Sequence, residues 1–223
     1  MADWYVRDSL IKFETPCTIS IISATNGGKT TFVERMLQNS GGMFNDDFSK
    51  IVYCYGSTWQ PIFDDMLKTK PDIIFKVGVP SVGELETFTA DQTHTCLVLD
   101  DLMCEINSTS GVEKIWTVHS HHLRMTVIFL THNLFPKSPA ARSISLNTKY
   151  FVLFKNHRDA LQIQHFSRQI YPNQSKFFMK AYQLATENLW GYLLVDLSSF
   201  SNDDYRLRTR IFPNEDTVIY QPG

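Results

Sequence analysis

The sequence predicts an α/β fold in which helices flank a mostly parallel central sheet. Short β-rich runs alternate with helical patterns along the chain, and this order is typical of parallel sheets. Several of the runs are apolar at nearly every position, as expected of strands that are covered on both faces. A glycine-rich turn joins the first strong strand directly to a helix, which is the connection of a βα unit.

Length and composition set limits on the class of protein. The 223 residues fit a single domain over 1–223, with a core at about 15–200 and a C-terminal edge strand and tail at 201–223. Lysine and arginine number 21 against 23 acidic residues, so a net charge of −2 gives no basic footprint over the whole chain. The four cysteines form no C-x-x-C pair, which favours reduced thiols over zinc. We expect no membrane span and no secretion signal.

The first half of the chain alternates strands and helices. A buried strand at 18–23 (TISIIS) precedes a helix at 29–38, which Gly41 and Gly42 are expected to end through a left-handed glycine cap. Ser81 and Glu84 have the spacing of a capping box, so a helical turn begins there. The other expected elements are strands at 50–55, 73–77 and 95–100 and a short helix at 61–67.

The second half continues the pattern. Ser110 and Glu113 repeat the capping-box spacing and open a helix before the buried strand 125–130 (MTVIFL). Further strands are expected at 150–154 and 192–197, with helices at 159–170 and around 177–185. Three arginines then alternate with other residues as in a terminal edge strand: Arg206, Arg208 and Arg210.

The segment SATNGGKTT, Ser23 to Thr31, predicts a phosphate-binding loop. It matches G-x-x-x-x-G-K-[ST] except that Ser23 replaces the first glycine. Backbone N–H groups and the helix N-terminus attract phosphate, Lys29 is expected to reach the β- and γ-phosphates, and the Thr30 hydroxyl to bind Mg²⁺. The alternative is a Gly-Lys turn that caps a helix without ligand. The expected nucleotide-binding residues are Thr25, Asn26, Gly27, Gly28, Lys29, Thr30 and Thr31.

The segment TCLVLDD places two acidic residues, Asp100 and Asp101, at the carboxyl end of a buried strand, where α/β proteins bind their ligands. Asp100 is expected to hold Mg²⁺ through water, and Asp101 to orient or deprotonate an attacking water. Many ATPases with this Walker B arrangement have glutamate at the place of Asp101. The alternative is a solvated acidic strand end, but the order of the two motifs favours nucleotide binding.

Polar residues also follow the strand MTVIFL. If this strand lies beside the Walker B strand, His132 or Asn133 can sense the γ-phosphate. A simple turn between strand and loop is the alternative.

Several segments together resemble the genome-packaging ATPases of double-stranded DNA viruses and virus-like transposons, the poxvirus and polinton type within the FtsK–HerA superfamily of P-loop NTPases. They recur in the family's order from about residue 15 to 211. That family usually has glutamine at the place of His132. The segments are SATNGGKTTFVERML, KIVYCYG, CLVLDDLM, HSHHLRMTVIFLTHNLFPK, ARSISLNTKYFVLFKNHRDALQI and YLLVDL.

The resemblance implies an additional-strand P-loop ATPase that uses ATP and Mg²⁺ and assembles into a pentameric or hexameric ring. Such rings thread double-stranded DNA into a preformed capsid, so a capsid or portal-vertex protein is an implied partner, with no membrane. The implied location is the nucleus or cytoplasm of a host cell. Arg142 and Arg158 match arginines of the family, and either could act as a finger on a neighbouring subunit's γ-phosphate.

Three other functions remain open from the sequence. A DNA pump or helicase of the same superfamily differs from a packaging motor only in its partners. A small-molecule P-loop kinase would bind an acceptor and show no stimulation by DNA, and the sequence has no clear acceptor-site or lid motif. A nucleotide-gated adaptor would bind ATP without releasing phosphate.

The arginine row at 206–210 either contacts DNA phosphate or protects an exposed edge.

Overall fold

The computed structural model describes residues 2–7, 11–102, 105–106, 123–135, 139–156, 158, 160–199 and 201–222. The helix expected from Ser110 and Glu113 lies outside the described residues. Within them, no helix combines the length and the apolar character that a membrane crossing requires.

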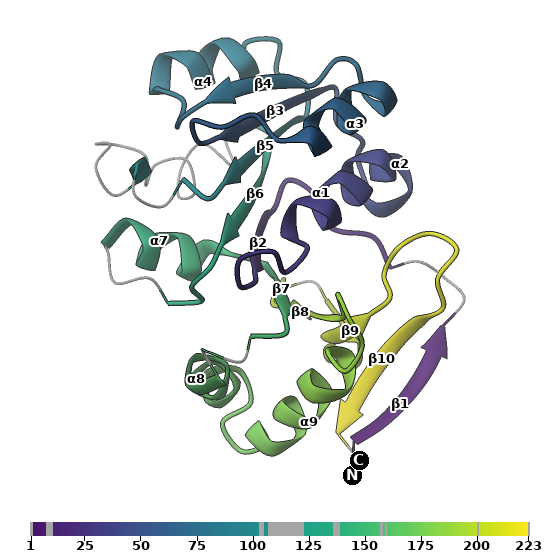
Figure 1. Cartoon of the computed structure of the whole chain (residues 1–223). Coiled ribbons are helices and arrows are strands. Elements are labelled where there is room, and N and C mark those ends of the chain that lie inside the picture. The colour runs from purple at the N-terminus through teal and green to yellow at the C-terminus, as the bar shows by residue number, and fades with distance from the viewer. Residues whose placement is uncertain are drawn as a thin grey trace.

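One ten-stranded sheet organises the molecule (Figure 1), in the order β1-β10-β9-β8-β7-β2-β6-β5-β3-β4. The six strands from β7 to β4 are parallel to their neighbours, and β8, β9, β10 and β1 extend the sheet with antiparallel pairs. The strands are β1 Ala2–Arg7, β2 Thr18–Ile22, β3 Lys50–Tyr55, β4 Ile74–Val77, β5 Thr95–Asp100, β6 Met125–Thr131, β7 Tyr150–Phe154, β8 Tyr192–Asp196, β9 Leu207–Thr209 and β10 Thr217–Pro222.

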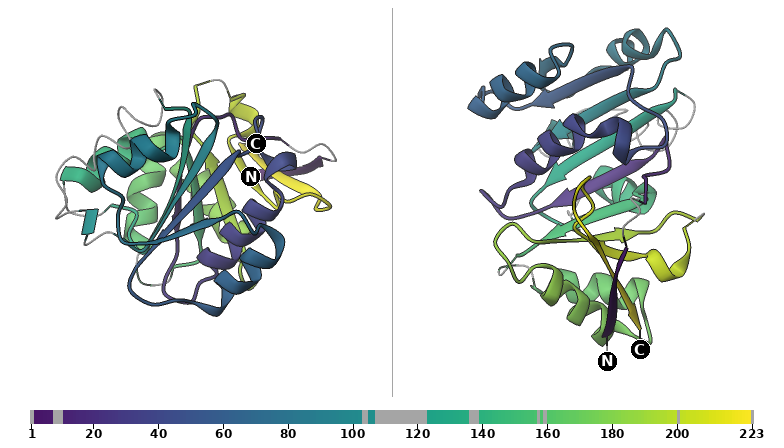
Figure 2. Two further views of the ribbon diagram at one scale, coloured as in Figure 1. Left: turned by 90° about the horizontal axis from the view of Figure 1, so that it is seen from above. Right: turned by 90° about the vertical axis from the view of Figure 1, so that its right-hand side faces the viewer.

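Helices cover both faces of this sheet (Figure 2). α1, α2 and α3 pack on one face, while α4, α7, α8 and α9 pack on the other, and each layer buries a hydrophobic cluster against the strands. The helices are α1 Lys29–Gln38, α2 Ser40–Met43, α3 Pro61–Thr69, α4 Val82–Thr89, α7 Pro139–Asn147, α8 Ala160–Ile170 and α9 Ser175–Ala185, with a short 3₁₀ turn at Asp203–Tyr205.

The α/β fold with a mostly parallel sheet is therefore confirmed. β6 lies between β2, which precedes the glycine-rich loop, and β5, which carries the acidic pair. This is the additional strand that the resemblance implied. The capping box also forms, since Ser81 accepts from the N–H of Glu84 and the Glu84 carboxylate accepts from the N–H of Ser81.

The expected C-terminal edge strand is wrong. β9 lies inside the sheet between β8 and β10, so the edge on this side is formed by β1. Arg208 is only 1% exposed and donates to Asp196 across a buried 3.1 Å ion pair. Buried charges persist in proteins when they are paired in this way. Arg208 therefore neither protects an exposed edge nor faces DNA phosphate.

The expected glycine cap of the first long helix is also wrong. α1 ends at Gln38, and Asn39 caps it without a left-handed backbone, at φ −105°. Gly41 and Gly42 instead belong to the short helix α2. Elements that the sequence analysis did not anticipate are β1, α2, α7 and β10.

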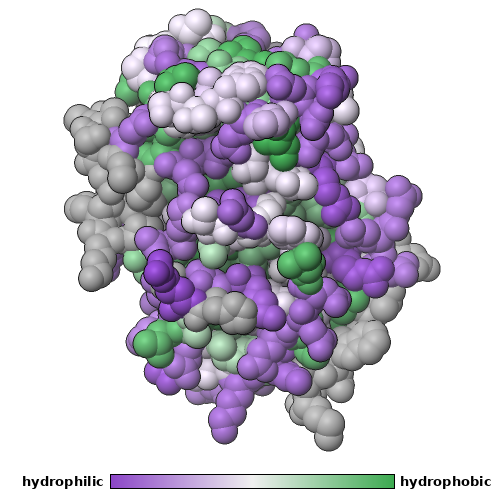
Figure 3. All heavy atoms as spheres, in the orientation of Figure 1, coloured by the Kyte–Doolittle hydropathy of each residue, from purple (hydrophilic) through white to green (hydrophobic). Residues whose placement is uncertain are grey.

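Exposed large hydrophobic side chains are scattered over the described surface. On the face seen in Figure 3, hydrophobic residues form separate small areas among hydrophilic ones. Trp59, Ile74, Val77 and Val82 lie around the β4 edge of the sheet. Scattered residues of this kind are ordinary for a protein surface and carry no functional conclusion alone.

His94 gives the fold a dependence on pH. Its side chain is 3% exposed, and its Nε2 lies 2.8 Å from the Thr126 hydroxyl while its Nδ1 lies 3.1 Å from the Asp46 carbonyl. Burial lowers the pKa of His94 below its ordinary value, although nearby Asp46 opposes the shift. Protonation is thus disfavoured in the folded state, so the stabilisation is present above the unfolded pKa and is lost as pH falls through the folded pKa.

We expect His94→Gln to flatten this acid response. Glutamine keeps hydrogen-bonding capacity toward Thr126 but does not titrate, so the decline in thermal unfolding temperature below about pH 6.5 should be shallower than in the wild type. Unfolding curves followed by circular dichroism across that range measure the difference. The other histidines are common to both proteins, and equal slopes would show that His94 does not carry the effect.

Candidate functional site

The glycine-rich turn forms a tight loop between β2 and α1. Gly28 has a left-handed backbone at φ 92°, and Asn26 also has a positive φ of 58°. A Cβ on Gly27 would lie 1.7 Å from the Ser23 hydroxyl oxygen and 2.9 Å from the Ala24 carbonyl oxygen, so only glycine fits there. Ser23 itself is buried and its hydroxyl donates to the Ala24 carbonyl. The loop thus closes with serine in place of the first glycine of the pattern.

Lys29 is the buried cation of this loop. Its ammonium donates to the Ser23 carbonyl at 3.3 Å, lies 3.0 Å from His132 Nδ1 and is 3.9 Å from Asp101 Oδ2. Burial lowers the pKa of Lys29, and the carboxylates of Asp101 and Asp100 act against this shift. An ammonium held at the mouth of a loop of backbone N–H groups is suited to an anion that carries several negative charges.

Asp100 ends β5 as a buried carboxylate. The Tyr53 hydroxyl, from the neighbouring strand β3, donates to Asp100 Oδ2 at 2.8 Å. Burial raises the pKa of Asp100. Hydrogen bonds from the Tyr53 and Thr30 hydroxyls and the positive charge of Lys29 lower it. The pKa of Tyr53 is itself raised well above its ordinary value by burial and by Asp100, so the phenol remains a donor. Tyr53 was not anticipated from the sequence, because its partner is set by the pairing of β3 with β5.

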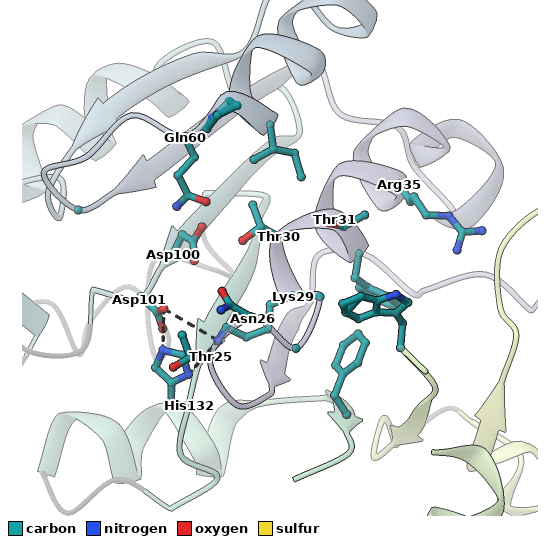
Figure 4. Close-up of a pocket in the computed structure, with 18 of the residues that line it drawn as sticks. Thr25, Asn26, Lys29, Thr30, Thr31, Arg35, Gln60, Asp100, Asp101 and His132 are labelled. Carbon is teal, nitrogen blue, oxygen red and sulfur yellow. Dashed lines mark hydrogen bonds and ion pairs between the residues drawn. The ribbon is translucent and has the colours of Figure 1, made fainter. Parts of the chain in front are cut away.

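The side chains of Asp101 and His132 contact each other beside Lys29 (Figure 4). His132 Nε2 lies 2.8 Å from Asp101 Oδ2. His132 Nδ1 is 2.9 Å from the Ser23 carbonyl as well as near Lys29, so it either accepts from the lysine or, when protonated, donates to the carbonyl. The side chain of Asp101 is 45% exposed and faces the pocket. The adjacency of β5 and β6, on which the sensor prediction depended, is confirmed.

Lys29, Asp100, Asp101 and His132 line one pocket of about 870 Å³ at the carboxyl edge of the parallel strands. In Figure 4, Asp100, Asp101 and His132 lie on one side of the loop, and Arg35 lies on the other side, farther along α1. The predicted residues that line the pocket are Thr25, Asn26, Gly27, Gly28, Lys29, Thr30, Thr31, Asp100, Asp101 and His132. Lining residues that the sequence analysis missed include Arg35, Gln60, Phe154, Trp190 and Tyr192.

Three predicted site residues lie elsewhere. Asn133 is exposed and its backbone exchanges hydrogen bonds with the Thr131 hydroxyl, outside the lining of this pocket. Of the two sensor candidates, His132 is therefore the one at the pocket. Arg142 on α7 and Arg158 after β7 are exposed and do not line it. A finger for a neighbouring subunit has to lie outside its own pocket, so these two roles stay predictions.

The donor set fits Mg²⁺. Thr30 offers a hydroxyl and Asp100 a carboxylate, which are the hard oxygen ligands that Mg²⁺ prefers. Burial raises the pKa of Asp100, and a cation beside the carboxylate would oppose this effect. Among the described residues, no cluster of three or more His, Cys, Asp or Glu side chains forms a metal cage. Mg²⁺ commonly binds through one or two protein ligands together with substrate phosphates.

Comparison with solved structures supports the fold. The chain is similar to the DNA-packaging ATPase B204 of Sulfolobus turreted icosahedral virus, with a TM-score of 0.56, 9% identity and coverage of 93% of this chain and 98% of that one. It is also similar to the genome-packaging NTPase B204 of Sulfolobus turreted icosahedral virus 2 in complex with ATPγS, with a TM-score of 0.53, 13% identity and coverage of 83% and 94%. No protein-family model and no curated protein matches the chain.

The likeness extends over most of both chains, so this chain shares the fold of these two proteins. The fold that the sequence resemblance implied is confirmed. At such low identity the likeness establishes the architecture, and the activity has to be argued from the residues of the pocket.

Proposed function

We propose that this chain binds ATP with Mg²⁺ and hydrolyses it. One observation carries the proposal: Lys29 and the acidic pair, which lie about seventy residues apart in the sequence, converge on one pocket, with 3.9 Å between Lys29 Nζ and Asp101 Oδ2. A loop that only capped a helix would need no acidic strand end beside its lysine. The complex of B204 with ATPγS is in line with a nucleotide in this pocket.

The residues divide the reaction between them. Loop N–H groups and the Lys29 ammonium hold the β- and γ-phosphates, and Thr30 with Asp100 holds Mg²⁺, which neutralises phosphate charge. Asp101 orients the attacking water and accepts its proton, while the hydrogen bond from His132 fixes the carboxylate. Lys29 contacts His132 and Asp101, so a bound phosphate would compete with them for the ammonium. Catalysis then rests on positioning and electrostatic stabilisation.

We further propose that hydrolysis drives double-stranded DNA into a capsid through a ring of these chains at a capsid or portal vertex in a host cell. The fold shared with two packaging ATPases supports this role. Arg142 and Arg158 are both exposed and so are available to a neighbouring subunit as fingers. With a net charge of −2, DNA contact has to come from a local surface or from several copies around a channel.

Phosphate release with and without double-stranded DNA, together with mass measurement in ATP, tests this function. We expect ATP-dependent assembly and faster phosphate release when DNA is present. Protection of DNA from nuclease that depends on added capsids would separate packaging from a pump or helicase of another kind. Phosphate transfer to a small acceptor without DNA stimulation would instead identify a kinase, and tight ATP binding without release a nucleotide-gated adaptor.

A further inference from the structure

The turn that carries Trp190 reaches the pocket because β8 runs in the opposite direction to the parallel strands. β8 runs antiparallel to β7, and its first residue Tyr192 pairs with Phe154, the last residue of β7. The residues just before β8 are therefore placed at the carboxyl edge of the parallel strands, beside the phosphate loop. Trp190, Tyr192 and Phe154 all line the pocket there.

Trp190 is held in a fixed but exposed position. A Cβ placed on Gly28 would lie 3.2 Å from Trp190 Cε3, so the indole lies directly over the glycine that precedes Lys29. The following residue, Gly191, approaches the backbone so closely that a Cβ would lie 2.5 Å from the Ala185 carbonyl oxygen, and its N–H donates to the Asn188 carbonyl. These contacts fix the turn, and Trp190 has a left-handed backbone at φ 62°. A non-glycine residue in this conformation is uncommon and indicates a local constraint.

Trp190 is more exposed than the aromatic residues that line the pocket beside it. It remains 56% exposed, whereas Phe154 and Tyr192, which line the same end of the pocket, are buried. The opposite end carries the charged groups Lys29, Asp100 and Asp101. The pocket thus has Lys29 and the two carboxylates at one end and the aromatic side chains, with Arg35 nearby, at the other, an arrangement that suits a nucleoside triphosphate.

We propose that Trp190 is the stacking platform for the base of the bound nucleotide. The inference rests on the proposed function, since it assumes that the triphosphate lies on the loop around Lys29. With the phosphates there, the sugar and base extend past Gly28 toward the indole that covers this glycine. Stacking on an aromatic face binds any base, because every base has a π-face.

Two polar side chains near this end of the pocket already have partners elsewhere. Arg35 lines the pocket, but its guanidinium is paired with Glu215 at 2.9 Å and stacks over Phe212. The Tyr192 hydroxyl accepts from the Ile211 N–H. Recognition by stacking without edge contacts predicts that ATP and GTP bind with similar affinity.

Calorimetric titration of the full chain with ATP, GTP and inorganic tripolyphosphate tests the platform. We expect Trp190→Ala to weaken ATP and GTP binding by roughly 5- to 100-fold, the range of base–aromatic stacking, and to leave tripolyphosphate affinity unchanged. Trp190→Phe should retain most of the nucleotide affinity. Leu189→Ala is the matched control, because Leu189 is adjacent and 80% exposed but does not line the pocket.

Fluorescence gives a second readout. The chain has four tryptophans, and the part of an ATP-induced emission change that disappears in Trp190→Phe belongs to Trp190. Unchanged ATP affinity in Trp190→Ala would overturn the platform, and so would equal losses for ATP and tripolyphosphate, which would indicate support of the loop instead. A wild-type chain that binds neither ligand would contradict the proposed function itself, and the two failures are therefore distinguishable.

Discussion

Replacement of Lys29 by alanine is expected to abolish ATP binding. Lys29 is a buried cation of the pocket, and in the proposed site alanine would leave the β- and γ-phosphate oxygens without their charged partner. A lost hydrogen bond to a charged group costs about 1.5–3 kcal/mol, and more when charge is left uncompensated, so we expect an affinity loss on the order of 100-fold or greater. Equilibrium binding of ATP and of tripolyphosphate measures it.

The loss should not come from unfolding. Burial lowers the pKa of Lys29, so the fold disfavours its charged form, and circular dichroism of the variant checks that alanine keeps the fold. Lys68→Ala serves as the matched control, since Lys68 is exposed and contacts only the surface residue Asp65 in its ion pair. Wild-type ATP affinity in Lys29→Ala would exclude this loop as the phosphate site.

The parallel half of the fold was predictable because its signals are local. Strands covered on both faces are continuously apolar, and glycine-lysine and capping-box patterns mark the helices that follow them. α7 was missed because its residues, PAARSISLN, include serine and asparagine, which are weak helix formers. The sequence also could not show that Arg208 is buried, since its partner Asp196 becomes adjacent only through the pairing of β8 with β9.

The residues of the site likewise fall into those that a local sequence pattern predicts and those that it does not. The loop and the acidic pair have fixed spacing, so their residues were identified and the structure brings them together. The choice between His132 and Asn133 depends on which of two adjacent residues turns toward the pocket at the end of β6, and side-chain alternation at a strand end does not determine that. Tyr53 and Trp190 belong to the site through strand order alone, which no local pattern encodes.

Asp101→Asn is expected to retain ATP binding and lose hydrolysis. Asparagine is nearly isosteric and tolerates the left-handed backbone that Asp101 has at φ 54°. Its amide oxygen can still accept from His132, but it cannot take a proton from water. General-base catalysis contributes about 100- to 10,000-fold, so we expect a fall of that order in phosphate release. Single-turnover hydrolysis and equilibrium ATP binding, measured on the same samples, separate the two effects.

The direction of the binding change makes this test specific. Lys29 lies 3.9 Å from the Asp101 carboxylate, and a neutral amide in its place would attract the ammonium less strongly. Asp101→Asn should therefore bind ATP as tightly as the wild type or more tightly, whereas a misfolded pocket would bind it less well. Asp65→Asn, at an exposed position on α3, should change neither quantity. Normal turnover in Asp101→Asn would remove this carboxylate from the mechanism and leave water activation to another group, with the phosphate site around Lys29 intact.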